Sequence, residues 1–391
     1  MLPRVHHGVL DIPPRVDVVV IGGGIIGCAA AAMLADRGAH VLLVEGTAIG
    51  AGASGRNLGA LQHPFDPVLA PLHTDSIARY RALADSDADL SVGRAPAGLL
   101  LLNRDEAAAE AQAVRLAASV PELDPELLSP AEVRRLEPSL APGPAAVRLA
   151  TGYPIPPAAA TAAWAALAVE KGVDLVLGIA ARPTVADGRA AGATLADGRT
   201  VAAGAVLVAA GPWSPRLIDP DGGWAPIVPT YGVTVQLRLP APPSHIVEED
   251  EVDAINVGRP EAATARAAAS SDADTPSVFS LASAGGVSTL GSTFLPAEPD
   301  AATVQSLLIR RAATWLPAIA TAEVIGRRLC ARPQSIDGRP FIGEVGAQRL
   351  FVCAGHGPWG ISTGPGSAAI VARAILDGTS PPGDLAASRP I

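Results

Sequence analysis

The feature that most constrains this chain is a strand–turn–helix–strand unit between Asp17 and Glu45. An apolar run is followed by Gly22, Gly24 and Gly27 in a G-x-G-x-x-G arrangement, then by an alanine-rich segment and a second apolar run. In such a unit the glycines permit a tight turn, a close approach to a pyrophosphate and close helix packing, while the terminal acid accepts hydrogen bonds from a ribose. The sequence therefore predicts a dinucleotide site. The predicted contacts in this unit are Gly22, Gly24, Ile25, Ile26, Gly27, Glu45 and Gly46.

Later segments indicate which dinucleotide is bound. Residues 50–59 read Gly-Ala-Gly-Ala-Ser-Gly-Arg-Asn-Leu-Gly, a run of small residues that can wrap a long cofactor. A plain nicotinamide-binding fold usually continues here into another helix and strand. Near the C-terminus, residues 331–343 contain an R-P-x-x-x-D-G-x-P pattern, and residues 350–362 lead to a helix that we expect from Gly366. Together these segments resemble the FAD-dependent amine and amino-acid oxidoreductases of the D-amino-acid oxidase superfamily, which includes glycine oxidase and sarcosine oxidase.

The resemblance extends over nearly the whole chain and implies an α/β (α+β) fold. It implies a Rossmann-type FAD-binding domain interleaved with an antiparallel-sheet substrate domain. We expect the FAD-binding domain to comprise residues 1–90, 150–228 and 325–391, and the substrate domain to comprise residues 91–149 and 229–324. Periodicity alone indicates only a mixture of helices and strands.

The resemblance also assigns cofactor contacts outside the glycine turn. Ser54 is expected to bond a phosphate, with Arg56 and Asn57 near the flavin ring and the pyrophosphate, although ordinary loop hydrogen bonds would also explain these residues. The full set of further expected contacts is Ser54, Arg56, Asn57, Leu58, Gly59, Ala181, Gly211, Trp213, Arg332, Gly355, His356, Gly357, Gly360 and Ile361.

Three residues are expected to serve the reaction itself. Arg332 stands where glycine oxidase-like relatives bind the substrate carboxylate, and a guanidinium can hold a carboxylate bidentately. His356 stands where the family approaches the pyrimidine edge of the flavin, and Tyr231 begins a strand that borders the substrate cavity in relatives. The alternatives are an arginine paired within the fold, a histidine bonded in its loop and a buried structural tyrosine. Trp359 replaces a lysine of sarcosine oxidase-type relatives, which suggests a more apolar wall.

Cys330 and Lys171 concern flavin attachment and oxygen reactivity. Cys330 lies seven residues before Asp337, the spacing at which sarcosine oxidase relatives attach the flavin covalently, but its neighbours follow the non-covalent glycine oxidase-like pattern. We therefore expect a buried thiol and non-covalent FAD. Lys171 is the only lysine, so a lysine that activates oxygen near the flavin is not expected. This favours a dehydrogenase that passes electrons to a quinone or another carrier, with oxygen as the alternative acceptor.

Composition excludes several classes of protein. The formal net charge of −9 argues against a nucleic-acid partner. No apolar run reaches the roughly 18 to 20 residues needed to span a bilayer, and no metal site is expected. Three cysteines give no disulfide framework and indicate the cytoplasm.

The remaining elements are predicted from pattern. Helices are expected over residues 79–89, 105–119 and 158–171, with a capping box from Ser129 to Glu132. Strands are expected over residues 98–102, 174–181, 201–209, 233–239, 277–281 and 287–290. Residues 241–253 and 261–274 read as exposed inserts without an assigned role.

The leading hypothesis is oxidation of the C–N bond of a small amino acid, which is a D-amino acid or a glycine-like, N-alkylated or cyclic one. A hydride passes to flavin N5 and the imine product then hydrolyses. The first alternative is a flavin-containing subunit of a multi-subunit amine dehydrogenase, and an oligomer or partner subunit would fit the apolar composition. The second is a relative that oxidises a hydroxy acid.

Overall fold

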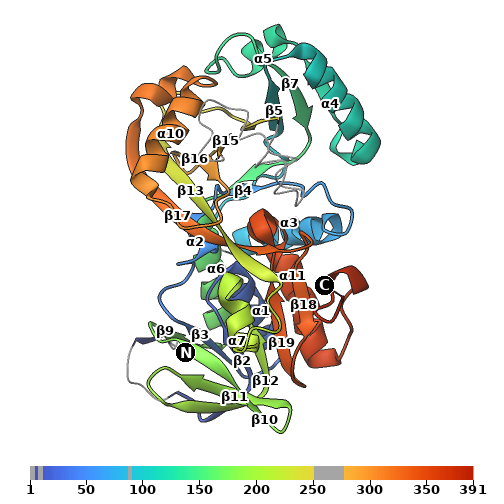
Figure 1. Cartoon of the computed structure of the whole chain (residues 1–391), viewed down its shortest axis with the longest axis vertical. Helices are drawn as coiled ribbons and strands as arrows, with labels where there is room; N and C mark the ends of the chain where they lie inside the picture. The colour runs from blue at the N-terminus through green and yellow to red at the C-terminus, as the bar shows by residue number, and fades with distance from the viewer. Residues whose placement is uncertain (1–4, 8–11, 87–89, 251–276, 391) are drawn as a thin grey trace.

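The computed structural model describes residues 5–7, 12–86, 90–250 and 277–390, and two large β-sheets lie toward opposite ends of the elongated molecule (Figure 1). Within these residues, the first sheet runs in the order β1 (Val5–His7), β9 (Asp174–Leu177), β3 (Val41–Glu45), β2 (Arg15–Ile21), β12 (Thr200–Val208), β11 (Arg189–Leu195) and β10 (Ala181–Ala186). Strand β19 (Leu350–Ala354) also pairs with β12, and β18 (Phe341–Glu344) pairs with β19.

The centre of the first sheet is parallel and buried on both faces. Strands β9, β3, β2, β12 and β19 pair in parallel, as the predicted βαβ unit requires. Val18, Val19 and Val20 are at most 1% exposed, which explains why this strand reads as a continuous apolar run. Helix α1 (Ile25–Asp36) packs on the sheet and against α6 (Pro157–Glu170) and α11 (Gly360–Asp377). Its buried alanines permit this close approach.

The second sheet is antiparallel apart from one parallel pair, β14 with β5. Within the described residues its order is β17 (Glu323–Ser335), β13 (Ile227–Arg238), β16 (Val287–Thr293), β15 (Ser277–Ala284), β14 (Ile246–Glu249), β5 (Leu99–Asn103), β7 (Ala145–Leu149) and β6 (Glu126–Leu128). Helix α10 (Ala301–Ala313) buries Val304, Leu308 and Ala312 in a core shared with Phe279 and Leu281. The apolar side of this amphipathic helix therefore covers one face of the sheet.

Smaller elements connect the sheets. They are α2 (Ala53–Arg56), β4 (Ala60–Leu61), α3 (Ala70–Ala84), α4 (Glu106–Ser119), α5 (Pro130–Leu136), β8 (Tyr153–Pro154) and α7 (Ser214–Ile218), with short 3₁₀ turns that include Gly211–Trp213 and Gly357–Trp359. The strands of the two sheets alternate along the chain, as the predicted interleaved fold requires. The domain boundaries themselves remain a prediction.

Several local predictions are confirmed. Helices α4 and α6 and strand β5 lie within a residue or two of their expected bounds. Ser129 and Glu132 form the expected capping box at the start of α5. The glycine turn joins β2 to α1 as predicted.

Several expected elements have different bounds, and the strand expected over residues 233–239 begins at Ile227. Helix α3 spans Ala70–Ala84 rather than residues 79–89. Pro71 lies in its first turn, where backbone N–H groups make no hydrogen bond within the helix, so a proline is tolerated there. Residues 87–89 lie outside the described residues. The strand expected over residues 174–181 is two strands, because Gly178 adopts φ +78° between them.

The prediction that residues 241–253 form an exposed insert is wrong for residues 246–249, whereas Ala241, Pro242 and Ser244 are exposed as expected. Residues 246–249 form β14, which is buried and pairs with β5 and β15. Two consecutive glutamates made this segment read as surface, but Arg311 pairs with Glu249 through two hydrogen bonds of 2.8 and 2.9 Å. Residues 251–253 and 261–274 lie outside the described residues.

The last helix begins at Gly360 rather than Gly366. Pro365 lacks an N–H and would ordinarily leave the carbonyl of Ile361 without its helical partner. The buried hydroxyl of Tyr80 donates to that carbonyl at 2.8 Å, and the hydroxyl of Ser76 accepts from the N–H of Gly366 at 2.9 Å. Two side chains of α3 therefore stabilise a helical turn whose own sequence disfavours it.

Candidate functional site

A cavity of about 690 Å³, called here the main cavity, lies at the carboxyl ends of β2, β3, β12 and β19. The starts of α1 and α11, the short helix α2 and residues 332–333 of β17 complete its wall. Ligands of open α/β sheets bind outside the carboxyl ends of the strands. The main cavity is therefore where the βαβ unit predicts a dinucleotide.

The glycine turn brings backbone to one side of the main cavity. Gly22 has φ +115°, and a Cβ there would lie 2.5 Å from the carbonyl oxygen of Ala209. Gly24 lines the cavity at the start of α1, whereas Gly27 does not. A Cβ on Gly27 would collide with the carbonyl oxygen of Gly22, so this glycine serves helix–strand packing. Ile25 and Ile26 also line the cavity.

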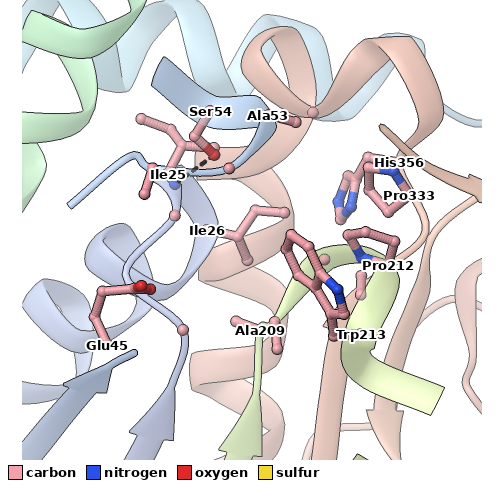
Figure 2. Close-up of a pocket in the computed structure, with 18 of the residues that line it drawn as sticks. Ile25, Ile26, Glu45, Ala53, Ser54, Ala209, Pro212, Trp213, Pro333 and His356 are labelled. Carbon is pink, nitrogen blue, oxygen red and sulfur yellow. Dashed lines mark hydrogen bonds between the residues drawn. The ribbon is translucent and has the colours of Figure 1, made fainter. Parts of the chain in front are cut away.

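Glu45 is held rigidly at the end of β3. Its Oε2 accepts from the N–H of Gly23 at 2.7 Å, and its Oε1 accepts from the N–H and hydroxyl of Thr47 at 2.8 and 2.9 Å. Glu45 and Gly46 line the main cavity. Figure 2 shows Glu45 toward one end of the drawn cavity and His356 toward the other. A carboxylate fixed in this way is preorganised to accept hydrogen bonds from a diol.

The small-residue loop contributes a second wall. Ser54 Oγ accepts from the N–H of Ile25 at 2.9 Å, the dashed line in Figure 2, and thereby ties α2 to the start of α1. Asn57 Nδ2 donates to the carbonyl of Ser54 at 2.9 Å, and Asn57 Oδ1 accepts from the N–H of Gly59 at 2.8 Å. Arg56 donates to a backbone carbonyl of β17 and lines the main cavity, as do Ser54 and Asn57. Gly59 does not line it, and its φ of +81° serves the turn before β4.

The opposite wall comes from the segments before β10 and after β12. Ala181, Gly211 and Trp213 line the main cavity as expected, and the Trp213 side chain is 57% exposed. Figure 2 shows the indole beside Pro212 and Ile26. Sequence reasoning missed Ala209, Ala210, Pro212, Pro333, Cys353 and Ala354, which also line the cavity. The signal that would have found most of them is their position at the ends of β12 and β19.

His356 is a buried, neutral hydrogen-bond acceptor on the main cavity. Burial lowers its pKa to about 3. Ser367 Oγ donates to the carbonyl of Thr363 and lies 2.9 Å from His356 Nε2, so Nε2 carries the proton and Nδ1 keeps a lone pair. Among the described residues, Nδ1 has no hydrogen-bond partner. A buried acceptor of this kind calls for a donor from a ligand.

The start of α11 lies next to His356. Gly357, Gly360 and Ile361 line the main cavity, whereas Gly355 does not and instead takes the turn with φ +93°. Because α11 starts at Gly360, its positive N-terminal end lies at the cavity wall. Both α1 and α11 therefore direct their positive ends toward the same space.

Arg332 is a buried guanidinium. The residue is 8% exposed, and burial lowers the pKa of its side chain. Nη1 donates to the carbonyl of Thr293 at 2.7 Å, Nη2 donates to the hydroxyl of Ser292, and Cζ lies 4.4 Å from the centroid of the Phe294 ring. In the described part of the chain no carboxylate pairs with it. A buried cation held only by neutral groups favours binding of an anion.

Arg332 also lines a second, smaller cavity of about 70 Å³, called here the side chamber. Asn57, Pro358 and Ile361 line both cavities, so the side chamber adjoins the main cavity. Its full lining is Asn57, Leu58, Ala60, Gln62, Glu248, Val278, Ser280, Ser292, Phe294, Arg332, Pro358, Trp359, Ile361 and Ser362. Leu58 was expected to contact the cofactor, but the structure places it here rather than in the main cavity. Sequence reasoning did not find Glu248, because it lies in the segment taken for an exposed insert.

The structure does not bring Tyr231 to either cavity. Arg332 on β17 pairs across from Thr230 on β13, and its guanidinium covers Gly232. Because side chains alternate along a strand, Tyr231 points to the other face of the sheet. The expectation that its hydroxyl contacts the substrate is therefore not supported by its position. Gly232, which sequence reasoning overlooked, leaves the space that Arg332 occupies.

Cys330 is buried on β17 and lines neither cavity. Burial raises the pKa of its thiol, against the lowering effect of Arg332 and Arg56. A thiol kept protonated in this way is a poor nucleophile.

The described chain matches a known family over most of its length. Residues 17–374 match the family described as DAO, FAD dependent oxidoreductase. The chain belongs to this family. It is therefore an FAD-dependent oxidoreductase. Glycine oxidase from Geobacillus kaustophilus (strain HTA426) is 29% identical over 379 residues, which cover 92% of this chain and 93% of that protein.

Solved structures give the same picture of the DAO family fold. The crystal structure of glycine oxidase from Geobacillus kaustophilus superposes with a TM-score of 0.80 at 25% identity, covering 97% of this chain and 100% of that one. L-proline dehydrogenase from P. horikoshii superposes with a TM-score of 0.77 at 20% identity, covering 94% and 95% of the two chains. The two large sheets are thus the FAD-binding and substrate parts of this fold.

The main cavity fits FAD on its own structural features. The backbone of Gly22 and Gly24 lines the cavity without side chains, and two helix N-termini meet the cavity. His356 Nδ1 offers a buried acceptor, and most of the wall is apolar. No helix in the described residues is long and apolar enough to cross a membrane.

Proposed function

We propose that this enzyme oxidises the C–N bond of a small amino acid whose carboxylate binds Arg332. The observation that carries the proposal is the buried guanidinium at the junction of the main cavity and the side chamber, without a carboxylate partner among the described residues. A substrate carboxylate would supply the missing negative charge. The similarity to glycine oxidase supports an amino acid as the substrate.

FAD supplies the hydride acceptor when it is bound, and the imine product hydrolyses in water. The chain's own contribution is to position the substrate and to exclude water from it. Arg332 fixes the substrate's orientation through a bidentate contact, and Phe294 and Trp359 provide apolar surface in the side chamber. The positive end of α11 stabilises negative charge that develops in the adjoining cavity.

The same proposal assigns the contacts to FAD. Glu45 would accept hydrogen bonds from the ribose of the adenosine half, and the start of α1 at Gly24 would face the pyrophosphate. Ser54, tied to the start of α1, would lie beside the phosphates. His356 Nδ1 would accept a hydrogen bond from the flavin ring. Burial of the Cys330 thiol away from both cavities supports non-covalent binding, so an acid-precipitated pellet should be colourless.

We further propose that electrons pass to a quinone or another carrier rather than rapidly to oxygen. Lys171, the only lysine, forms an ion pair of 2.6 Å with Asp36 and lines neither cavity. A lysine therefore does not place its charge beside the flavin. Rapid production of hydrogen peroxide by the reduced enzyme would contradict this assignment.

The cysteines support a location in the cytoplasm. Cys28, Cys330 and Cys353 are free and buried. Thiols persist unpaired most readily in a reducing compartment.

The test of the proposed function is an anaerobic titration of the FAD-loaded protein with D-, L-, cyclic and N-methyl amino acids, followed by the visible spectrum. Bleaching by one member of this panel would identify the substrate class. Bound flavin that only hydroxy acids reduce, or that nothing reduces, would refute the proposal. Failure to bind FAD after reconstitution would contradict the fit of the main cavity.

A further inference from the structure

The side chamber is lined by a basic and an acidic side chain from two different strands. Arg332 comes from β17 and Glu248 from β14, and both line the chamber. Arg332 has no carboxylate within ion-pair distance in the described part of the chain, so these two groups do not pair directly. The chamber that both residues line has a volume of about 70 Å³, which leaves room for a small ligand.

Strand alternation separates Glu248 from its neighbour Glu249. Both residues are buried, at 3% and 5% exposure. Glu249 pairs with Arg311 of α10, on the face of the sheet that this helix covers. Side chains of consecutive strand residues point to opposite faces, so Glu248 faces away from α10 and toward the chamber. A buried carboxylate is thus directed to the space that Arg332 also lines.

Gln62 adds a second acceptor to the same chamber. Its Nε2 donates to Glu248 Oε2 at 3.3 Å. Because a carboxylate accepts but does not donate, this contact fixes the orientation of the amide. Gln62 is 4% exposed, and its Oε1 is buried without a hydrogen-bond partner among the described residues. An acceptor left in this state requires a donor, which a substrate can bring.

We propose that Glu248 and Gln62 Oε1 bind the ammonium group of a zwitterionic substrate whose carboxylate binds Arg332. This inference deepens the proposed function and rests on it. The ammonium group has three donors and no acceptor, which suits a wall with a carboxylate and an amide oxygen. The guanidinium likewise has only donors, which suits the carboxylate. The side chamber thereby distinguishes an amino acid from a hydroxy acid or a simple carboxylate of the same shape.

The test compares two ligands that have the same shape and cannot donate a hydride. 2-Aminoisobutyrate carries an ammonium group on a carbon without hydrogen, and trimethylacetate replaces that group with a methyl. Their dissociation constants are measured by isothermal titration calorimetry on the FAD-loaded protein. We expect the wild type to bind 2-aminoisobutyrate more tightly. In Glu248→Gln this preference should fall about 10- to 100-fold, the scale of a charge-assisted hydrogen bond, while trimethylacetate binds as before.

Glu249→Gln is the matched control, because it makes the same change at the adjacent buried residue on the other face. It should leave the ratio of the two dissociation constants unchanged. Gln62→Met gives a second variant that keeps the volume and removes both the acceptor and the amide donor to Glu248, and it should lower the preference several-fold. This variant decides the question if Glu248→Gln does not fold.

The outcomes separate this inference from the proposed function. If Glu248→Gln or Gln62→Met prefers 2-aminoisobutyrate over trimethylacetate as strongly as the wild type does, the ammonium site is overturned and the role of Arg332 stands. Equal binding of the two ligands by the wild type would overturn it as well. Binding of both ligands that is unaffected by Arg332→Ala, or binding of neither ligand by the wild type, would refute the carboxylate anchor and with it the proposed function.

Discussion

Gly232→Ala tests whether the position of Arg332, and not only its charge, determines carboxylate binding. A Cβ at Gly232 would lie 2.5 Å from Cζ and 2.6 Å from Nη1 of Arg332. Ordinary contacts between heavy atoms are longer, so the guanidinium must move by about 1 Å. Because it is the far end of a flexible side chain, this movement costs little stability. Gly232 lies within β13, where alanine is tolerated.

The effect on binding should be much larger than the effect on stability. Hydrogen bonds between charged groups contribute about 1.5–3 kcal/mol, and a misplacement of about 1 Å can cost about 100-fold in rate. We therefore expect Gly232→Ala to weaken binding of a small carboxylate such as trimethylacetate about 10- to 100-fold. The melting temperature should stay within about 3 °C of the wild type. Calorimetry with the FAD-loaded protein measures the first quantity and thermal unfolding the second.

Gly326→Ala is a matched control on the paired strand. A Cβ there would lie 2.6 Å from Gln236 Oε1, which is also the end of a flexible side chain, but neither residue lines the main cavity or the side chamber. This control should not change carboxylate binding. Unchanged affinity in Gly232→Ala, together with a large loss in Arg332→Ala, would show that the guanidinium keeps its function after displacement and would refute the geometric argument.

Three other predictions concern binding and stability. Arg332→Ala should weaken carboxylate binding about 10- to 150-fold by calorimetry, since it removes the charged donors, and an unchanged affinity would contradict the anchor. Tyr80→Phe should lower the free energy of unfolding by about 1–2 kcal/mol and release FAD more readily, because the carbonyl of Ile361 loses its donor. Urea unfolding measures the first effect and flavin fluorescence the second, and an unchanged stability would contradict this role of α3. Burial lowers the pKa of His73 to about 4 and that of His356 to about 3, below the usual value for histidine. Between about pH 6.5 and 4 the folded protein therefore binds fewer protons than the unfolded chain, and its free energy of unfolding should fall as the pH falls. Each histidine should contribute about 1.5 kcal/mol of this loss between pH 6.5 and 5, and His73→Leu should reduce the slope in urea titrations, whereas an identical slope would count against the burial argument.

Local patterns in the sequence predicted the elements whose cause is local. The glycine turn, the apolar runs of β2 and β3 and the capping box at Ser129 depend on neighbouring residues, and all of them form as expected. The start of α11 could not be predicted in this way. Its stability depends on side chains of α3, nearly 300 residues earlier in the chain.

The same distinction applies to the candidate site. Residues of the main cavity follow strand ends and helix starts, so most of them could be found from the βαβ pattern and the family resemblance. The side chamber could not be found, because Arg332, Gln62 and Glu248 come from three distant segments that only the folded sheet brings together. Glu248 read as part of an exposed acidic segment, since nothing near it in the sequence indicates burial.

By itself, then, the sequence determined the dinucleotide-binding unit, the mixed fold and the family, because short-range geometry and apolar periodicity encode them. The tertiary structure alone decided which strand face each glutamate of β14 occupies, how Gly232 leaves space for Arg332 and which polar groups share the side chamber. These relations depend on register and packing between strands far apart in the chain, and no local pattern of residues specifies them.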